Sequence, residues 1–250
     1  MKERQKQMVD LINQRGAISF SQLKVAFSDV SDMTIRNDLK TLDTLKLIVR
    51  VHGGAKSVDR IIGTDDILNK RLFRNVDKKK QIAEKAVSLL YAGTSIFLDS
   101  GSTLTAFAQK FPDQCHLIFT SGISCAYELA KLQNTQVYMI GGKVNKLSMS
   151  ISGTDSCEKV KENNYDIVFL GATGYVKGLG FNCGSSEEAA LKKAIIARAD
   201  TVVVLLDSSK IDISNPFNFA TTKEVDIVVS DNELEMDIVE YFRNNNIKVL

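Results

Sequence analysis

The sequence predicts a small, mainly α-helical winged helix-turn-helix domain followed by an α/β domain with a mainly parallel sheet. Three observations support this fold class. Residues 1–57 contain three helical patterns and then an extended apolar run closed by glycines. Over the remaining chain, short β-branched runs alternate with helical patterns, which is typical of a parallel sheet covered by helices on both faces. The two parts also differ in charge.

Positive charge is concentrated near the N-terminus. Residues 1–57 hold ten Lys and Arg against six Asp and Glu, a net charge of +4. Of the 32 basic and 30 acidic residues in the chain, the rest therefore holds 22 and 24, a net charge of −2. This asymmetry favours a small segment that lies on phosphate backbones, although small domains also carry such a charge without touching nucleic acid.

Length and composition set the expected domain organisation. The 250 residues, 44% of them hydrophobic, suffice for one small and one ordinary domain. We expect the winged helix-turn-helix at 1–57, a linker at 58–76 and the α/β domain at 77–250. The apolar runs are too short to cross a bilayer, and the first residues, MKERQKQ, form no secretory hydrophobic region. We therefore expect a cytoplasmic protein without a membrane partner.

No cofactor and no metal are expected. The four cysteines show no CxxC spacing, and only two histidines are present to complete a metal site, so reduced structural thiols are the simpler interpretation. Neither GxGxxG nor GxxxxGK followed by Ser or Thr occurs in the sequence. Dinucleotide and nucleoside triphosphate binding therefore have no support.

The first domain begins with three helices and ends in a wing. Residues 2–15 have helical spacing up to a stop at Gly16, and Ser19 caps a second helix. A third helix, capped by Ser31 or Asp32, follows a short turn. The segments 47–51 and 52–55 are typical of the strand and turn of a wing. The buried face of the third helix is expected to consist of Ile35, Leu39, Leu42 and Leu45.

The exposed residues of the third helix are candidates for reading DNA. Arg pairs with guanine and Asn with adenine through two hydrogen bonds, while Thr and Lys hold phosphates. A solvated surface helix would carry the same residue types, so this pattern alone leaves both interpretations open. The candidates are Asp32, Thr34, Arg36, Asn37 and Lys40.

Strand and helix patterns alternate in the second domain. A short helix is also expected within the linker, around 67–73. The expected strands are 95–98, 117–120, 137–140, 167–170, 202–206 and 227–230. The expected helices are 79–91, 103–110, 124–132, 186–199 and 236–245.

Ligands of open parallel sheets bind beyond the carboxyl ends of the strands. Here, Ser100, Gly101, Ser102 and Thr103 precede a helix whose N–H groups attract anions. Lys210 would add positive charge, and Asp99 would accept hydrogen bonds from sugar hydroxyls or hold its own loop. Turn and capping preferences alone also favour Gly, Ser and Asp at such positions. The segments after the strands are Asp99–Thr103, Thr120–Gly122, Gly141–Gly142, Gly171–Gly174 and Asp207–Lys210.

Two motifs of the first domain, VSDMTIRNDL at 30–39 and RVHGGA at 50–55, resemble the signature of the DeoR family of bacterial sugar-responsive repressors. The usual family form runs close to VSxxTIRRDL and RxHGGA. The resemblance implies a winged helix-turn-helix that binds operator DNA. On its signature positions lie Ser31, Thr34, Arg36 and Asp38, with Arg50 and His52 in the wing.

Five single residues qualify this resemblance. Asn37 stands where the family commonly has Arg, which would alter the preferred operator sequence. Lys46 stands where the family usually has a glycine, so we expect a strained cap or a longer helix there. We interpret Asp38 as structural, because DNA repels a carboxylate. Arg50 is expected to reach a phosphate or to pair with an acid, and His52 to be a turn residue or a backbone contact.

The resemblance covers nearly the whole chain. It implies a sensor domain related to ribose-5-phosphate isomerases, with sugar phosphates as the usual effectors. TSGI at 120–123 departs from the family's TNSL, which puts the role of that loop in doubt. The matching blocks are LDSGST at 98–103, IGG at 140–142, FLGATG at 169–174, GLGFN at 178–182, EAALKKA at 188–194 and DSSK at 207–210.

Four further residues lie at positions that match the family, two in these blocks and two in or next to the linker. Glu188 and Lys192 lie one helical turn apart, so they form an exposed ion pair or, as matched family positions, face the ligand. Arg71 and Lys79 match positions that the family tends to hold basic. Their role cannot be read from spacing.

The sequence therefore predicts a regulator, most simply a repressor of carbohydrate-metabolism genes, whose operator binding a phosphorylated sugar modulates. The alternative is an isomerase-like enzyme that carries a DNA-binding domain. Isomerisation needs a carboxylate base beside the sugar, and FLGATG offers none where the related isomerases carry acids. Paired half-sites favour a homo-oligomer. The identity of the sugar, the operator and the direction of the response stay open.

Overall fold

The computed structural model describes residues 3–15, 17–45, 47–51, 53–57 and 68–250. The chain divides into two compact units, 1–66 and 67–250. Gly16, Lys46 and His52 lie outside the described residues. The helix before Gly16 ends at Arg15, and the third helix ends at Thr44, so the longer helix expected around Lys46 does not form. The expected linker contains α4 (Leu68–Leu72) and the start of α5 (Val76–Val87), while 58–67 are not described.

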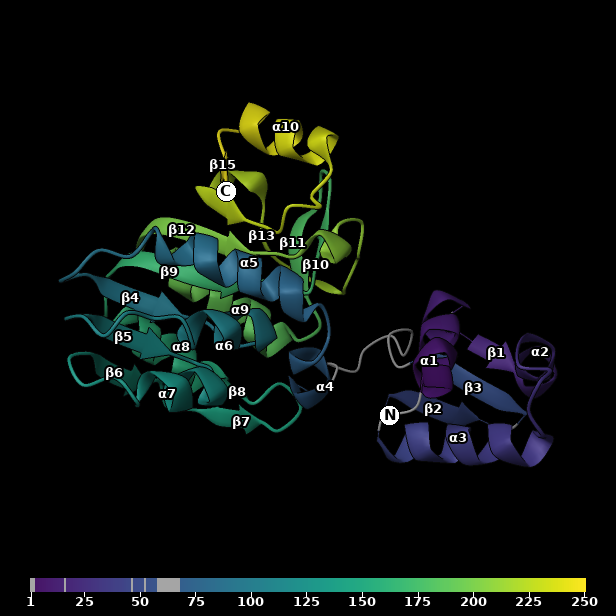
Figure 1. Ribbon diagram of the computed structural model, residues 1–250. Coiled ribbons are helices and arrows are strands. Elements are labelled where there is room, and N and C mark those ends of the chain that lie inside the picture. The colour runs from purple at the N-terminus through teal and green to yellow at the C-terminus, as the bar shows by residue number, and fades with distance from the viewer. Residues whose placement is uncertain (1–2, 16, 46, 52, 58–67) are drawn as a thin grey trace. The chain divides into compact units, whose positions relative to one another are not determined.

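Helices and a small antiparallel sheet, in the order β1-β3-β2, build the first unit (Figure 1). Ser19 caps α2 through a reciprocal capping box with Gln22, and Ser31 caps α3, so both predicted helix starts are confirmed. The three residues of β1, which the sequence pattern did not predict, pair with β3 at the wing. The elements are α1 (Glu3–Arg15), β1 (Ala17–Ser19), α2 (Phe20–Ala26), α3 (Asp32–Thr44), β2 (Ile48–Val51) and β3 (Gly54–Ser57).

One apolar core joins the helices of this unit to the wing. Ile35, Leu39 and Leu42 are buried in it, as predicted, but Leu45 is 53% exposed. The helix ends before Leu45, and the chain then turns so that Leu47 packs against the core. The backbone N–H of Leu47 donates to Leu42 O over 2.9 Å. The prediction that Leu45 extends the buried face is therefore wrong.

Asp38 fixes α3 on α1. Its buried carboxylate accepts hydrogen bonds from Arg4 Nε at 2.7 Å and from Gln5 Nε2 at 2.8 Å. A buried carboxylate needs such partners, because unpaired it would lose its hydration without compensation. The structural interpretation of Asp38 is confirmed, and the opposite face of α3 is left to solvent.

Parallel strands form the central sheet of the second unit, in the order β15-β14-β12-β9-β4-β5-β6 (Figure 1). The six predicted strands all belong to it, and β15, which contains only two residues, was not predicted. The strands are β4 (Ser95–Leu98), β5 (Leu117–Thr120), β6 (Gln136–Met139), β9 (Tyr165–Gly171), β12 (Ala199–Leu205), β14 (Ile227–Val229) and β15 (Lys248–Val249).

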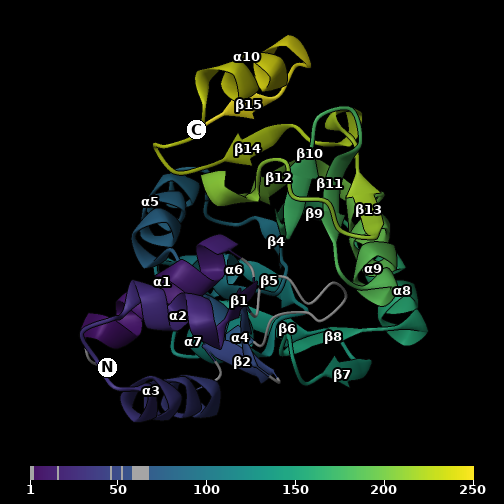
Figure 2. The ribbon, with the colours of Figure 1, turned by 90° about the vertical axis from the view of Figure 1, so that its right-hand side faces the viewer.

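Helices cover both faces of this sheet, because its inner strands are apolar on both sides. Ile96 and Leu98 pack with α5, α6 and α7, whereas Phe97 between them packs in the core that α8, α9 and α10 cover. Figure 2 shows α8 and α9 lying together on one side. The further helices are α6 (Ser102–Ala108), α7 (Ile123–Leu129), α8 (Thr154–Lys161), α9 (Ser186–Ile196) and α10 (Met236–Asn244). Of these, α8 was not predicted.

Five short strands outside the central sheet were not predicted either. Two form an antiparallel hairpin, and three form a small antiparallel sheet in the order β10-β11-β13. They follow β6, β9 and β12 along the chain. The hairpin consists of β7 (Lys143–Asn145) and β8 (Ser150–Ser152), and the small sheet of β10 (Gly174–Val176), β11 (Gly180–Cys183) and β13 (Phe217–Ala220).

Candidate functional sites

The N-terminal half of α3 presents a polar, solvent-exposed face. Ser31 Oγ accepts a hydrogen bond from Thr34 N at 3.2 Å and lies 2.9 Å from Thr34 Oγ1, so both hydroxyls belong to the helix cap. Asp32 pairs with Lys24 of α2 over 3.0 Å. The expected base-reading residues that point into solvent are Arg36, Asn37 and Lys40.

Arg36 and Arg50 line one hollow between the helix-turn-helix and the wing. The guanidinium of Arg36 lies 4.3 Å from the ring centroid of Phe20, a cation–π contact that restricts its orientation. The backbone N–H of Arg50 donates to Asp43 Oδ1 over 3.0 Å, and its side chain is exposed. The structure thus brings these two arginines to one surface, while His52 lies outside the described residues.

A pocket lies in the second unit, beyond the carboxyl ends of the parallel strands. The loops after β4, β9 and β12 form part of its wall, because neighbouring parallel strands end at the same edge of the sheet. Of the expected effector-binding residues, the pocket is lined by Ser100, Gly101, Ser102, Thr103, Gly171, Glu188, Lys192 and Lys210.

The other expected residues do not line this pocket, and packing accounts for several of them. The buried Thr120 hydroxyl accepts a hydrogen bond from Gly122 N at 3.0 Å. A Cβ at Gly142 would lie 2.0 Å from Ser156 Oγ, and a Cβ at Gly174 would lie 2.1 Å from Ile213 O. The residues outside the pocket lining are Asp99, Thr120, Gly141, Gly142 and Gly174.

A buried ion pair between Lys192 and Asp99 lies at the floor of the pocket. Asp99 Oδ2 also accepts a hydrogen bond from Gly171 N at 3.1 Å, and Oδ1 accepts one from Ser121 Oγ at 3.1 Å. Burial alone would lower the pKa of Lys192, but Asp99 holds it above its ordinary value. Of the two alternatives for Glu188 and Lys192, an exposed ion pair is excluded, because Lys192 is buried against Asp99.

Besides Lys192, four cationic side chains line the same pocket: Arg71, Arg74, Lys79 and Lys210. Lys79, which is buried, donates hydrogen bonds to the backbone carbonyls of Arg71 and Arg74. Burial lowers the pKa of Lys79 to about 8; Asp207 opposes this shift, and the other three cations add to it. Only the family resemblance had drawn attention to Arg71 and Lys79, and Arg74 was missed.

Arg71, one of these cations, has a buried side-chain donor that lacks an acceptor. Its Nε is buried, and among the described residues no hydrogen-bond partner reaches it. A buried donor without an acceptor costs about 1–3 kcal/mol. An anion in the pocket would supply the missing acceptor and would also reduce the repulsion among the clustered cations.

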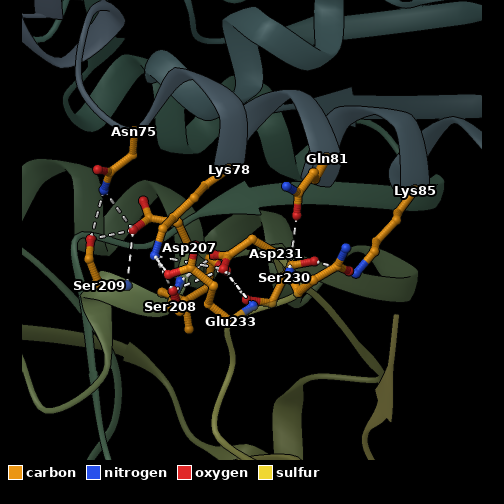
Figure 3. A network of polar contacts seen from close by, with 12 residues as sticks. Asn75, Lys78, Gln81, Lys85, Asp207, Ser208, Ser209, Ser230, Asp231 and Glu233 are labelled. Carbon is orange, nitrogen blue, oxygen red and sulfur yellow. Dashed lines mark hydrogen bonds and ion pairs between the residues drawn. The ribbon is translucent and has the colours of Figure 1, made fainter.

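Asn75 links this wall to the loop after β12. It adopts a left-handed backbone conformation with a φ of 50°, which asparagine tolerates better than most residues other than glycine. Its side-chain amide donates to Asp207 Oδ1 at 3.2 Å and to Ser209 Oγ at 3.0 Å (Figure 3). These bonds hold the junction of α4 and α5 against the 3-10 helix η2 (Ser208–Lys210).

Lys78 extends this connection along α5. Its Nζ donates to Ser208 Oγ at 2.7 Å and pairs with Glu233 at 2.8 Å (Figure 3). Asp231 accepts hydrogen bonds from the backbone N and the hydroxyl of Ser208, at 2.7 and 2.9 Å. The network therefore ties α5 to the ends of β12 and β14 and positions the short helix that carries Lys210.

Glu188 contributes a carboxylate to the pocket lining. Its Oε1 accepts hydrogen bonds from Ser148 Oγ and Ser150 Oγ, each at 2.9 Å. Both serines are buried and belong to the β7–β8 hairpin, and Ser148 itself lines the pocket. Ser148 was missed, because nothing in the sequence indicated that this hairpin would lie against α9.

Two further features concern metals and membranes. Within the described part of the chain, no group of three or more His, Cys, Asp or Glu is placed to hold a metal ion. The four cysteines are free thiols. Of the helices that the structure describes, none has the length and apolar character needed to cross a membrane.

A DNA-reading face on one unit and a ligand pocket in the other define a ligand-responsive DNA-binding regulator. Residues 4–61 match the model of the DeoR-like helix-turn-helix domain, and residues 74–232 match that of the DeoR C terminal sensor domain. The chain belongs to the DeoR family.

Its relatives are named as transcriptional regulators. The HTH-type transcriptional regulator GolR of Listeria innocua is 30% identical over 99% of this chain and 97% of its own length. The putative aga operon transcriptional repressor of Escherichia coli O157:H7 is 27% identical over 99% and 93%. The lactose phosphotransferase system repressor of Streptococcus mutans is 29% identical over 92% and 91%. This chain is accordingly a regulator rather than an enzyme.

Solved structures resemble parts of the chain. Ribose 5-phosphate isomerase A from Methanocaldococcus jannaschii matches 55% of each chain with a TM-score of 0.41 and 20% identity. The translation initiation factor eIF-2B from Pyrococcus horikoshii OT3 matches 64% of each chain with a TM-score of 0.46 and 16% identity.

Removing the buried cation should destabilise the second unit. Lys192→Met leaves the Asp99 carboxylate buried without its partner, so we expect a loss of roughly 3–5 kcal/mol in urea denaturation followed by circular dichroism. Asp99→Asn combined with Lys192→Met should recover part of this loss, since no charge stays buried. Lys193→Met, an exposed neighbour, should change stability by less than about 0.5 kcal/mol. Equal losses in the single and double variants would contradict this account of the pair.

Proposed function

We propose that this chain is a cytoplasmic repressor of carbohydrate-metabolism genes, that it binds operator DNA as a homo-oligomer, and that a phosphorylated sugar modulates this binding. Membership of the DeoR family supports the regulatory role. Two relatives are named as repressors of the aga operon and of the lactose phosphotransferase system, which supports a sugar-related target. Paired reading helices on symmetric half-sites favour the oligomer, since a single helix gives modest specificity.

The reading face of α3 is proposed to enter the major groove. The exposed side chains of Arg36, Asn37 and Lys40 suit base edges, and the net charge of +4 on residues 1–57 suits the phosphate backbone. The remaining residues of the proposed DNA interface, which position the helix and the wing on the backbone, are Ser31, Asp32, Thr34, Arg50 and His52.

The observation that carries the effector proposal is the group of cations at the pocket wall. Arg71, Arg74, Lys79 and Lys210 line one pocket, and the buried Nε of Arg71 lacks an acceptor among the described residues. A phosphate group offers charged acceptors to such donors. We assign the sugar phosphate to this pocket, with 100–103 as a second wall.

The same wall offers a route to the DNA-binding unit. Arg71 and Arg74 lie in the sequence shortly after the boundary between the two units, which falls between residues 66 and 67. A ligand that holds these arginines therefore acts on the backbone next to that boundary. Ligand binding then favours an arrangement of the reading units that fits the operator less well.

Operator binding tests the function directly. DNA that the purified chain selects from a random pool should bind in a gel shift, and a panel of pentose, hexose, polyol and amino-sugar phosphates should contain one that changes this affinity. Arg36→Ala should lower the preference for selected over scrambled DNA by roughly tenfold or more, because one bidentate base contact is worth about 1–3 kcal/mol. Arg15→Ala, on the exposed end of α1, should keep the preference. Unchanged discrimination by Arg36→Ala would rule out α3 as the reader.

The pKa of Lys79 predicts a pH dependence of effector binding. With a pKa of about 8, Lys79 loses its charge as the pH rises from about 7 to about 9, whereas the second ionisation of a phosphate, near 6, is already complete. Affinity for the effector should therefore fall roughly tenfold over this range, because a bound dianion keeps Lys79 protonated. Isothermal titration calorimetry at fixed ionic strength measures this fall. Lys79→Arg, which stays charged, should remove the pH dependence; a pH-independent wild type would contradict the assignment.

A further inference from the structure

The pocket carries charges of both signs on different structural elements. Its cations Arg71, Arg74 and Lys79 belong to α4, the following turn and α5, while the carboxylate of Glu188 belongs to α9. Lys192, which is also on α9, is already neutralised by its buried ion pair with Asp99. Asp207, a second pocket-lining carboxylate, is bonded to Asn75 and to Ser209. A ligand with one anionic end therefore meets a charge pattern that distinguishes its two ends.

Glu188 is held in position rather than left to adapt. Oε1 is fixed by the hydroxyls of Ser148 and Ser150, which also lie 2.7 Å from each other. The neighbouring Glu187 pairs with Lys143 over 3.0 Å and so ties the β7–β8 hairpin to the same helix turn. A fixed carboxylate accepts hydrogen bonds only, so it attracts hydroxyl or amine donors and repels a phosphate.

We propose that Glu188 determines the specificity and the orientation of the ligand: it accepts hydrogen bonds from the hydroxyls at the unphosphorylated end of a sugar monophosphate and excludes a second phosphate at that end. This inference rests on the proposed function, because it assumes that the phosphate binds at the cations. Its consequence is that the pocket selects sugar monophosphates over the corresponding bisphosphates. Ser148 and Ser150 act as positioning residues, since they hold the carboxylate in place.

Matched ligands separate this inference from simple phosphate binding. Isothermal titration calorimetry of the full chain would use fructose 1-phosphate, fructose 6-phosphate and fructose 1,6-bisphosphate, the equivalent glucose set, and inorganic phosphate. For the wild type we expect the better monophosphate of a set to bind at least roughly tenfold more tightly than its bisphosphate, as like charges repel strongly in a partly enclosed site. A bisphosphate that binds as tightly as its monophosphates would overturn the proposal.

Glu188→Gln neutralises the charge and keeps an oxygen that accepts hydrogen bonds from the serines. In this variant the monophosphate should bind more weakly and the bisphosphate more tightly, so that their ratio falls towards one. Glu187→Gln makes the same charge change on the same helix turn, outside the pocket lining, and removes only an exposed ion pair of small energy, so the ratio should stay unchanged. Ser148→Ala removes a hydrogen bond that positions the carboxylate without neutralising it, so this variant should weaken monophosphate binding. It tests the role of Glu188 if Glu188→Gln fails to fold.

The outcomes distinguish this inference from the proposed function. If inorganic phosphate and every monophosphate fail to bind the wild type, the assignment of a sugar phosphate to this pocket fails and the role of Glu188 fails with it. If monophosphates bind but Glu188→Gln leaves the ratio to the bisphosphate unchanged, only the role of Glu188 is overturned.

Discussion

The sensor unit depends on one buried ion pair, Lys192 with Asp99, because this contact joins chain segments that are far apart in sequence. Asp99 follows β4, Lys192 belongs to α9, and Gly171 at the end of β9 bonds to both side chains. Ser121, after β5, binds the other oxygen of Asp99. Each charge is buried, so neither tolerates the loss of the other, and the ends of the central strands are held in one geometry.

The ion pair fixes the floor of the pocket, and the walls above it come from different elements that carry different charges. The wall from α4 and α5 carries cations, and the wall from α9 and the β7–β8 hairpin carries Glu188 with its serines. Polar bonds from Asn75 and Lys78 hold the first wall against η2. In the proposed function, this division lets the pocket hold a phosphate at one wall and discriminate among sugars at the other.

The central sheet was predictable from the sequence because its inner strands are buried on both faces and therefore appear as continuous apolar runs. The short, antiparallel strands of the hairpin and the small sheet were not, since three or four residues with glycines carry little periodicity. The residues of the pocket were likewise predictable only in part. Loops after strands, such as Ser100–Thr103, could be predicted from topology, whereas Arg74 and Ser148 reach the pocket only through tertiary packing. The prediction that Leu45 is buried was wrong for a local reason, because a regular helical face does not show where the helix ends.

In the proposed function, the pocket acts as a sensor because its cationic wall follows the boundary between the two units closely in the sequence. Hydrogen exchange of the full chain, with and without a saturating effector identified by titration, tests it most directly. Backbone amides of α4 and of the first turns of α5 should exchange several-fold more slowly with effector bound, while those of α10 should not change. Protection confined to the loops 100–103 and 171–173, with α4 and α5 unchanged, would contradict the account.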